Sequence, residues 1–362
     1  MKKKVLLILH LPQPIHGASI IGKSIKESAF INNTIEADFI NLSTSESIKN
    51  IGSINFYKII HILKLQAQVL SHLLRKKYNL CYMTLTSSGK GFYKDVFIVF
   101  ILKLLRKKIV YHFHNKGIAN SQKYFINHLL YKFTFNNSSL ILLSPFLFDD
   151  VKRYFKIENV LFCPNGIENN SNYKFLYKNS SPLKVLFFSN MLVSKGALIL
   201  LKACKIIKNE NINFECHFVG EWADISADNF NKQVDELELN NVVFSHGRKN
   251  GLEKNTYFEN ANIFVLPTLQ DCFPLVLLEA MSFGLPLIST SEGAIPEILE
   301  NNINGFIVPK NDSVILADKI KILLLDDLLR KKMSDANVEK FKSKYTLEKF
   351  EENFSNILKQ IA

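Results

Sequence analysis

The stretch of residues 264–309 constrains the fold most, because it alternates strand, loop and helix signals twice. The apolar run Ile263–Leu266 predicts a buried strand, and Pro274 predicts the first position of a helix after a polar loop. A second apolar strand at Leu285–Thr290 and a short helix at Gly293–Leu299 follow. This rhythm is typical of an α/β fold with a parallel sheet that binds a ligand at its carboxyl edge.

The first helix of this stretch has the features of an anion site. Its free N–H groups and the positive end of its dipole suit a phosphate or diphosphate. Asp271 precedes the helix and Glu279 lies about one turn inside it, so two carboxylates are available to accept hydroxyl hydrogens beside the phosphate. The backbone positions expected to bind this anion are Phe273, Pro274, Leu275 and Val276.

The first part of the chain repeats the strand, loop and helix order. Val5–Leu9 predicts a strand, Gly17 ends the loop that follows, and Ser19–Phe30 has helical spacing of apolar residues. Further strands are predicted at Leu80–Thr84 and Ile109–His114, preceded by helices over residues 55–77 and 92–106, which indicates a parallel sheet. A plain strand-to-helix turn is the alternative explanation for Gly17, because glycine is common in turns.

Two histidines lie on the strand Ile109–His114 and point to one face. His114 is at the carboxyl end, where open α/β sheets bind ligands, whereas His112 is one step deeper and is expected to be a hydrogen-bonded structural residue. A metal pair is not favoured, because no third ligand follows at suitable spacing.

The second part of the chain begins again with a strand near Leu183 and a helix over Ala197–Ile207. Lys195 stands in the loop between them, where it is either a surface lysine or a cation for a bound anion. The strand Val242–Ser245 leads to Arg248, which fits a base-binding loop and a surface charge equally well. We predict a domain over 1–166, a polar linker over 167–182, a domain over 183–345, and a last helix over about 346–362 that packs back on the first domain.

Charge is distributed unevenly along the 362 residues. Residues 1–165 carry 23 Lys and Arg against 8 Asp and Glu, while residues 166–362 carry 22 against 25, so the net charges are +15 and −3. The basic first half favours a polyanionic partner. Aromatic and basic residues alternate over 56–78, as in a helix at an anionic membrane surface, although a solvated helix face gives the same pattern. No zinc-finger or RNA-binding signature is present, so nucleic acid is not expected.

The apolar runs, the first residues and the cysteines of the sequence favour a cytoplasmic protein. The most apolar run, Val96–Leu105, contains Lys103 and is too short for a bilayer, and the Lys-rich start leads into a strand rather than a signal peptide. Five scattered cysteines without a Cys-x-x-Cys pair are expected to be free thiols, and Cys272 is either a ligand contact or a small buried residue. They are Cys81, Cys163, Cys204, Cys216 and Cys272.

The stretch described first resembles family-4 retaining glycosyltransferases, which have the GT-B fold of two Rossmann-like domains facing across a cleft. The resemblance rests on two carboxylates with seven residues between them and on the residues that follow in the same order. These residues are Asp271, Glu279, Ala280, Met281, Gly284, Pro286, Gly293, Pro296, Glu297 and Asn304-Gly305-Phe306. Cys163-Pro164-Asn165-Gly166-Ile167 resembles the linker signature of the same family.

The resemblance implies a role for each matching position. Gly17 would let the backbone approach the diphosphate of a nucleotide sugar, and His114 would face the donor sugar. Lys195 would neutralise the leaving diphosphate, and Asp271 would hold the sugar. Glu279 would accept the ribose hydroxyls, and the backbone around Arg248 would hold the base. Lys195, Asp271 and His114 are the catalytic candidates, and no metal or other cofactor is expected.

The implied activity is retaining transfer of a sugar, from a UDP-sugar by preference, to a growing and lipid-linked glycan of capsule, O-antigen or exopolysaccharide at the inner face of the membrane. Two positions depart from the family: Asp271 is one methylene shorter than the usual Glu, and Asn190 stands where many relatives have Arg. A phosphorylase or storage-glucan synthase of the same fold is disfavoured because a cofactor-lysine signature is missing. A non-catalytic scaffold of this fold is the alternative of a different class.

Overall fold

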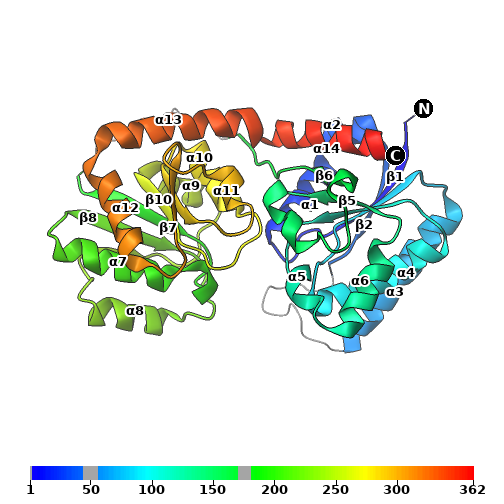
Figure 1. Ribbon diagram of the computed structural model, residues 1–362, viewed down its shortest axis with the longest axis horizontal. Coiled ribbons are helices and arrows are strands. Elements are labelled where there is room, and N and C mark those ends of the chain that lie inside the picture. Colours follow the sequence, from blue (N-terminus) through cyan, green and yellow to red (C-terminus); the bar gives the residue numbers. More distant parts are fainter. Residues whose placement is uncertain (1, 44–55, 170–180) are drawn as a thin grey trace. The chain divides into compact units, whose positions relative to one another are not determined.

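The computed structural model describes residues 2–43, 56–169 and 181–362, and the side chains of 56–59 are outside this description. The chain divides into two compact units, which are described separately below (Figure 1). Unit 1 comprises Met1–Gly166 and Leu347–Ala362, and unit 2 comprises Ile167–Thr346. Most of the predicted linker, residues 170–180, lies outside the described residues.

Unit 1 contains a six-stranded sheet of order β2-β1-β3-β4-β5-β6 in which every neighbouring pair is parallel. Its central strands are mostly apolar and, except for Lys4 at the start of β1, buried, because helices cover both faces of such a sheet. The strands are β1 (Lys4–Leu9), β2 (Glu36–Asn41), β3 (Leu80–Met83), β4 (Ile109–Phe113), β5 (Ser139–Leu142) and β6 (Val160–Phe162). The main helices are α1 (Gly17–Glu27), α2 (Ala29–Thr34), α3 (Phe56–Arg75), α4 (Gly89–Leu104), α5 (Ile118–Ser121) and α6 (Phe125–Phe135).

The last helix, α14 (Leu347–Ile361), belongs to unit 1 although it ends the chain. Its apolar residues recur at helical spacing and are buried. The Phe354 ring lies 5.1 Å from the Tyr82 ring of β3, so the end of the chain completes the core of the first sheet.

Unit 2 contains a second six-stranded parallel sheet, of order β12-β11-β10-β7-β8-β9. The strands are β7 (Leu183–Phe188), β8 (Phe214–Val219), β9 (Val243–Ser245), β10 (Ile263–Leu266), β11 (Leu287–Thr290) and β12 (Gly305–Val308). The helices are α7 (Ala197–Asn209), α8 (Ala227–Glu236), α9 (Gly251–Asn260), α10 (Leu275–Ser282), α11 (Ile295–Ile298), α12 (Ser313–Leu325) and α13 (Asp327–Lys344).

Two local features differ from the sequence prediction. The expected helix over Ser19–Phe30 is split, because the Ser28 hydroxyl accepts from the Ile31 N–H and starts α2 as an N-cap. Pro274 is the N-cap of α10 rather than its first residue. No helix among the described residues combines the length and the apolar character needed to span a bilayer.

Candidate functional site

Two loops meet at the carboxyl edge of the second sheet. One follows β7 and contains the short 3₁₀ helix η4 (Val193–Lys195), and the other follows β10. The Ser194 carbonyl accepts from the Leu269 N–H at 2.7 Å and from the Thr268 hydroxyl at 3.1 Å. These bonds fix the loop after β10 against the loop that carries Lys195.

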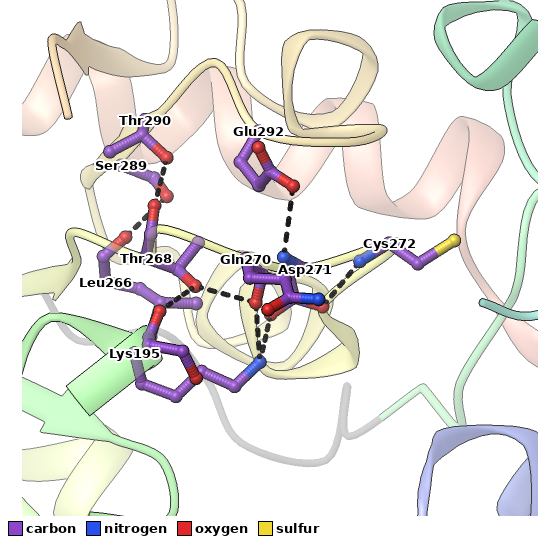
Figure 2. Close-up of polar contacts among 10 residues, drawn as sticks. Lys195, Leu266, Thr268, Gln270, Asp271, Cys272, Ser289, Thr290 and Glu292 are labelled. Atoms are coloured by element: carbon purple, nitrogen blue, oxygen red, sulfur yellow. Dashed lines mark hydrogen bonds and ion pairs between the residues drawn. The ribbon is translucent and has the colours of Figure 1, made fainter. Parts of the chain in front are cut away.

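Two hydroxyl groups on residues of β11 form hydrogen bonds that fix the end of β10 (Figure 2). The Ser289 hydroxyl donates to the Leu266 carbonyl at 2.6 Å, and the Thr290 hydroxyl donates to the Thr268 carbonyl at 2.6 Å. All three hydroxyl side chains, including that of Thr268, are buried, so they stiffen the floor of the site.

Lys195 and Asp271 form an ion pair at the centre of this edge (Figure 2). The Lys195 ammonium lies 2.6 Å from Asp271 Oδ2 and 3.4 Å from the Gln270 carbonyl. The Cys272 N–H donates to Asp271 Oδ1 at 2.9 Å. Because the side chains are 21% and 14% exposed, the pair is shielded but reachable from solvent.

Gly196 makes this approach of the two loops possible. It adopts φ +83°, and a Cβ there would lie 2.1 Å from the Pro267 carbonyl oxygen. Any other residue would be strained by its backbone angle and would collide with the loop after β10. Gly196 therefore positions the neighbouring Lys195 against the loop after β10.

The start of α10 lies where the sequence predicted an anion site. Pro274 is the N-cap, and it makes no side-chain capping hydrogen bond. Since the first turn of a helix lacks intrahelical acceptors, the N–H groups of Leu275 and Val276 are available for an anion. Phe273 is buried beneath them and lies 6.3 Å, centroid to centroid, from the Tyr345 ring.

Glu279 is paired with a lysine that sequence reasoning missed. Lys254, on α9, places its ammonium 2.6 Å from Glu279 Oε1 and over the rings of Phe188 and Phe258, at 5.5 and 5.9 Å from their centroids. Nothing in the local sequence pairs α9 with α10, so only the tertiary structure reveals this contact.

Arg248 and Asn190 lie in loops at the same edge. The Arg248 guanidinium is half-exposed and 3.0 Å from the Glu221 carboxylate, which follows β8. Gly220 allows the loop after β7 to pass close by, because a Cβ at Gly220 would lie 1.8 Å from the Ser189 carbonyl oxygen, next to Asn190. Unit 2 thus brings the candidates after β7, β9 and β10 to one edge.

Glu292 is a second residue that the sequence did not single out. It is 5% exposed, accepts from the Asp271 N–H at 3.4 Å, and forms an ion pair with Lys310. The adjacent Gly293 has φ +56°, and a Cβ there would lie 2.6 Å from the Asp271 and Cys272 carbonyl oxygens. This loop supports the backbone of Asp271 from behind.

In unit 1, Gly17 is the exposed first residue of α1, and His16 is the N-cap. His16 Nδ1 accepts from the Ser19 N–H at 3.4 Å, and the Ser19 hydroxyl accepts from the His16 N–H at 2.9 Å. The close backbone approach in this region belongs to Gly22, whose Cβ would lie 2.0 Å from the His10 carbonyl oxygen. Gly22 therefore lets α1 pack against the end of β1.

His114 belongs to a group of histidines at the ends of β1 and β4. Burial, with a smaller effect from the charge of His16, lowers the pKa of His114 to about 3. Burial likewise lowers the pKa of His10 and of His16. Both ring nitrogens of His114 are buried without a hydrogen-bond partner in the described part of the chain.

His112 has the structural role expected of it. It is fully buried, and its Nδ1 lies 2.7 Å from the Tyr82 hydroxyl. Its ring centroid is 4.3 Å from that of His114. Across residues 2–43, 56–169 and 181–362, no group of three or more His, Cys, Asp and Glu is arranged to hold a metal ion.

The cysteines that the structure describes are all free and buried. Cys272 is 9% exposed, as expected for a small buried residue. Burial raises the pKa of Cys81 to about 12 and raises that of Cys163 further, so these thiols stay protonated at neutral pH.

Part of the chain matches a known protein family. Residues 170–340 match the model of the family "Glycosyl transferases group 1". The amylovoran biosynthesis glycosyltransferase AmsK of Erwinia amylovora is 31% identical over 159 residues, which are 42% of this chain and 39% of AmsK. The capsular polysaccharide biosynthesis glycosyltransferase CapM of Staphylococcus aureus is 29% identical over 181 residues, which are 48% of this chain and 46% of CapM. The match thus spans less than half of these curated relatives.

Solved structures establish the fold over the whole chain. HepE of Anabaena, solved in complex with UDP, aligns with a TM-score of 0.73 at 17% identity and covers 99% of this chain and 100% of its own. Sucrose-phosphate synthase of Thermosynechococcus elongatus aligns with a TM-score of 0.72 at 16% identity and covers 100% of this chain and 99% of its own. The predicted GT-B fold of two Rossmann-like domains is confirmed.

Proposed function

We propose that this chain, whose residues 170–340 belong to the glycosyl transferases group 1 family, transfers a sugar from a nucleotide-diphosphate sugar to a growing glycan. The observation that carries the proposal is the grouping of Lys195, Asp271 and the uncapped start of α10 at one sheet edge. A cation, an acceptor and free N–H groups at this spacing suit a diphosphate joined to a polyol.

Each residue has a role that its contacts support. Lys195 and the first N–H groups of α10 neutralise the diphosphate and the charge that grows on it as the glycosidic bond breaks. Asp271 uses one lone pair of Oδ2 for Lys195 and one of Oδ1 for the Cys272 N–H, which leaves further lone pairs for sugar hydroxyls. Oε1 of Glu279 accepts a hydrogen bond from the Lys254 ammonium, so we assign Oε2 to the ribose hydroxyls.

The donor is proposed to be a UDP-sugar. HepE, which has the same fold, has been solved with UDP and with UDP-glucose. The loops after β8 and β9, which contain Glu221 and Arg248, are the assigned place for the base. Independence from a metal ion is part of the proposal, because Lys195 and α10 supply positive charge at the leaving group. Retention of configuration is proposed from the resemblance to family-4 enzymes.

The acceptor is proposed to be a growing, lipid-linked glycan of a bacterial surface polysaccharide. The names of the curated relatives refer to amylovoran, colanic acid and capsular polysaccharide. A lipid-linked acceptor requires the enzyme to work in the cytoplasm at the inner face of the membrane, where the basic first half would meet anionic lipids.

Isothermal titration calorimetry with a panel of nucleotide diphosphates and nucleotide sugars, with and without EDTA, tests the proposal. We expect one nucleotide to bind, with EDTA making no difference, and Glu279→Ala to weaken binding at least about tenfold by removing two hydrogen bonds to ribose. Glu236→Ala, at an exposed glutamate of α8, is the control. If the wild-type protein binds no nucleotide, the donor site is refuted.

A non-catalytic scaffold is the second candidate. Both carboxylates of the site already have lysine partners, Lys195 for Asp271 and Lys254 for Glu279, which also suits a purely structural role. The same titration separates the two functions, since a scaffold with closed ion pairs would bind none of the panel.

A further inference from the structure

Two neighbouring helices of unit 1 expose large apolar side chains in matching rows. On α4, the rings of Phe97 and Phe100 are 60% and 55% exposed and Leu104 is 69% exposed. On α6, Phe125, Leu129 and Phe133 are 74%, 48% and 38% exposed. Each row follows helical spacing, so each forms one stripe. We call these six residues the α4–α6 face.

Three contacts show that the two stripes lie side by side. The Tyr93 hydroxyl donates to the Asn127 side chain at 2.6 Å, near the start of both helices. The Phe100 and Phe133 ring centroids are 6.2 Å apart near their ends, and the Lys103 ammonium donates to the Asn136 carbonyl. A constant offset of about 33 residues therefore relates the two helices, as expected for parallel neighbours on one side of the sheet. Figure 1 shows α4 and α6 as neighbours in unit 1.

The surroundings of the face are strongly basic. Residues 89–135 contain a single carboxylate, Asp95, which is fully buried. The same stretch contains nine cations: Lys90, Lys94, Lys103, Arg106, Lys107, Lys108, Lys116, Lys123 and Lys132. Lys90, Lys123 and Lys132, at the start of α4, before α6 and on α6, are exposed.

We propose that the α4–α6 face docks on the surface of an anionic lipid bilayer, with the rings inserted at the level of the headgroups and the lysines paired with lipid phosphates. Exposed aromatic rings on a stretch that has many lysines and, over residues 89–135, no exposed carboxylate are complementary to such a surface. A protein partner would leave the excess of positive charge without a matching group unless it were itself acidic. The proposal rests on the proposed function in one respect, since a lipid-linked acceptor is found where this face would hold the enzyme.

The sequence placed the interfacial helix over 56–78, which corresponds to α3. Described residues of α3 include exposed Leu63, Leu70 and Leu74, but Lys76 at its end is paired with Asp38. The rows on α4 and α6 are wider and mainly aromatic, so they form the principal contact in this proposal.

Vesicle co-sedimentation of the full chain tests the docking. We expect binding to vesicles of phosphatidylcholine mixed with phosphatidylglycerol, weak binding to phosphatidylcholine alone, and loss of binding as salt is raised. Phe97→Ser combined with Phe125→Ser should lower the apparent affinity at least about tenfold, because two rings leave the interface. Leu325→Ser combined with Leu328→Ser, at equally exposed positions of unit 2 (72% and 79%), is the matched control and should bind as the wild type does.

The electrostatic part is tested by a second pair of variants. Replacing Lys90, Lys123 and Lys132 together by Gln should lower binding to the anionic vesicles on the order of a hundredfold, because each charge near the surface contributes roughly 1 kcal/mol. Replacing the exposed Lys331, Lys332 and Lys342 of unit 2 by Gln removes the same charge elsewhere and should have little effect.

Three outcomes would overturn the docking. The first is a wild-type chain that does not bind anionic vesicles, and the second is a Phe97→Ser/Phe125→Ser variant that binds them unchanged. The third is a concentration-dependent dimer, seen by analytical ultracentrifugation, that this variant abolishes, which would assign the face to self-association. Nucleotide titration of the same variants keeps the two proposals apart, since the substitutions lie in unit 1 and should leave the unit 2 site intact.

Discussion

Each of the two carboxylates of the candidate site, Asp271 and Glu279, forms an ion pair with one lysine. Lys195 is 2.6 Å from Asp271, and Lys254 is 2.6 Å from Glu279. The sequence proposed Lys195 and both carboxylates as site residues, and the structure shows that Lys195 and Asp271 are direct partners although 76 positions separate them. An ammonium held by Asp271 is preorganised to meet a diphosphate, so it should contribute to catalysis more than a mobile surface lysine would.

Lys195→Met should lower kcat/KM for the nucleotide sugar about a hundredfold to a thousandfold, because one preorganised charge is lost at the leaving group. Steady-state assays with the donor found by calorimetry would measure this. Lys205→Met is the control, since it removes another ion pair of unit 2, at 2.8 Å to Glu238, and should change kcat/KM less than about twofold. An unchanged kcat/KM in Lys195→Met would remove Lys195 from the catalytic site.

The lowered pKa of His114 predicts how the stability of the folded chain responds to acid. Its pKa is about 3 in the folded chain and near 6.5 when unfolded, so both states are neutral above pH 6.5. As the pH falls below 6.5, only the unfolded state takes up this proton, and stability declines by up to about 1.4 kcal/mol per pH unit until about pH 3. Stability from this group is therefore present at high pH and lost on acidification.

Urea unfolding at about pH 7.5 and about pH 5.5 would measure this effect. His114→Gln should lose less stability on acidification than the wild type, by about 1 kcal/mol, because the neutral amide does not titrate. His61→Gln, at an exposed residue of α3, should keep the wild-type pH dependence. Identical pH dependence in all three proteins would show that His114 is protonated in the folded chain.

At the scale of elements, glycines at the strand ends set the loops of the site. A neighbouring loop passes close to each of Gly196, Gly220 and Gly293. A Cβ at any of these positions would lie 2.6 Å or less from a carbonyl oxygen of that loop. The sequence located strands and helices well because apolar periodicity reports burial. It could not say which loop passes over which glycine, since those contacts join residues distant in the chain.

Gly196→Ala should destabilise the protein by at least about 3 kcal/mol, because the αL backbone angle and the clash with Pro267 add. Gly251→Ala is a matched control, with φ +55° but nothing within 4 Å of its Cβ, and should cost only about 1 kcal/mol. Denaturant unfolding of both variants gives the comparison. Equal costs would mean that backbone angle alone, and not the contact with the loop after β10, requires Gly196.

Two elements show where sequence patterns were weak. α13 was not predicted, because its sequence DLLRKKMSDANVEKFKSK is mostly polar, although it buries Met333 and Phe341. β6 is only three residues long, which leaves too little alternation to recognise. By contrast, β10 has the predicted bounds, Ile263–Leu266, because an apolar run with clear ends leaves few alternatives.

At the scale of the whole molecule, the last helix of the chain packs into the core of unit 1. Phe354 of α14 is fully buried and packs against Tyr82 of β3, while Phe341 of α13 is buried in unit 2. Two phenylalanines on successive helices therefore stabilise different units. The amphipathic pattern of the last helix predicted docking on the first domain, and the division of contacts agrees with it.

Phe354→Ala and Phe341→Ala should each cost about 3–5 kcal/mol of local stability, the first in unit 1 and the second in unit 2. Hydrogen–deuterium exchange with mass spectrometry should show lost protection in β1, β3 and β4 for Phe354→Ala. For Phe341→Ala the loss should fall in β10, β11 and β12 instead. If both variants lost protection in the same strands, the assignment of α14 to unit 1 would be refuted.

The sequence by itself determined the α/β class, the two parallel sheets and the positions of Lys195, Asp271, Glu279 and His114 in the chain. Local periodicity, turn residues and strand ends carry that information, because each depends on neighbours within a few positions. The tertiary structure alone decided which charges are partners, which loops touch through glycines, and that the exposed rings of α4 and α6 lie side by side. These features join residues far apart in the chain, and only the closed packing of each unit specifies such pairs.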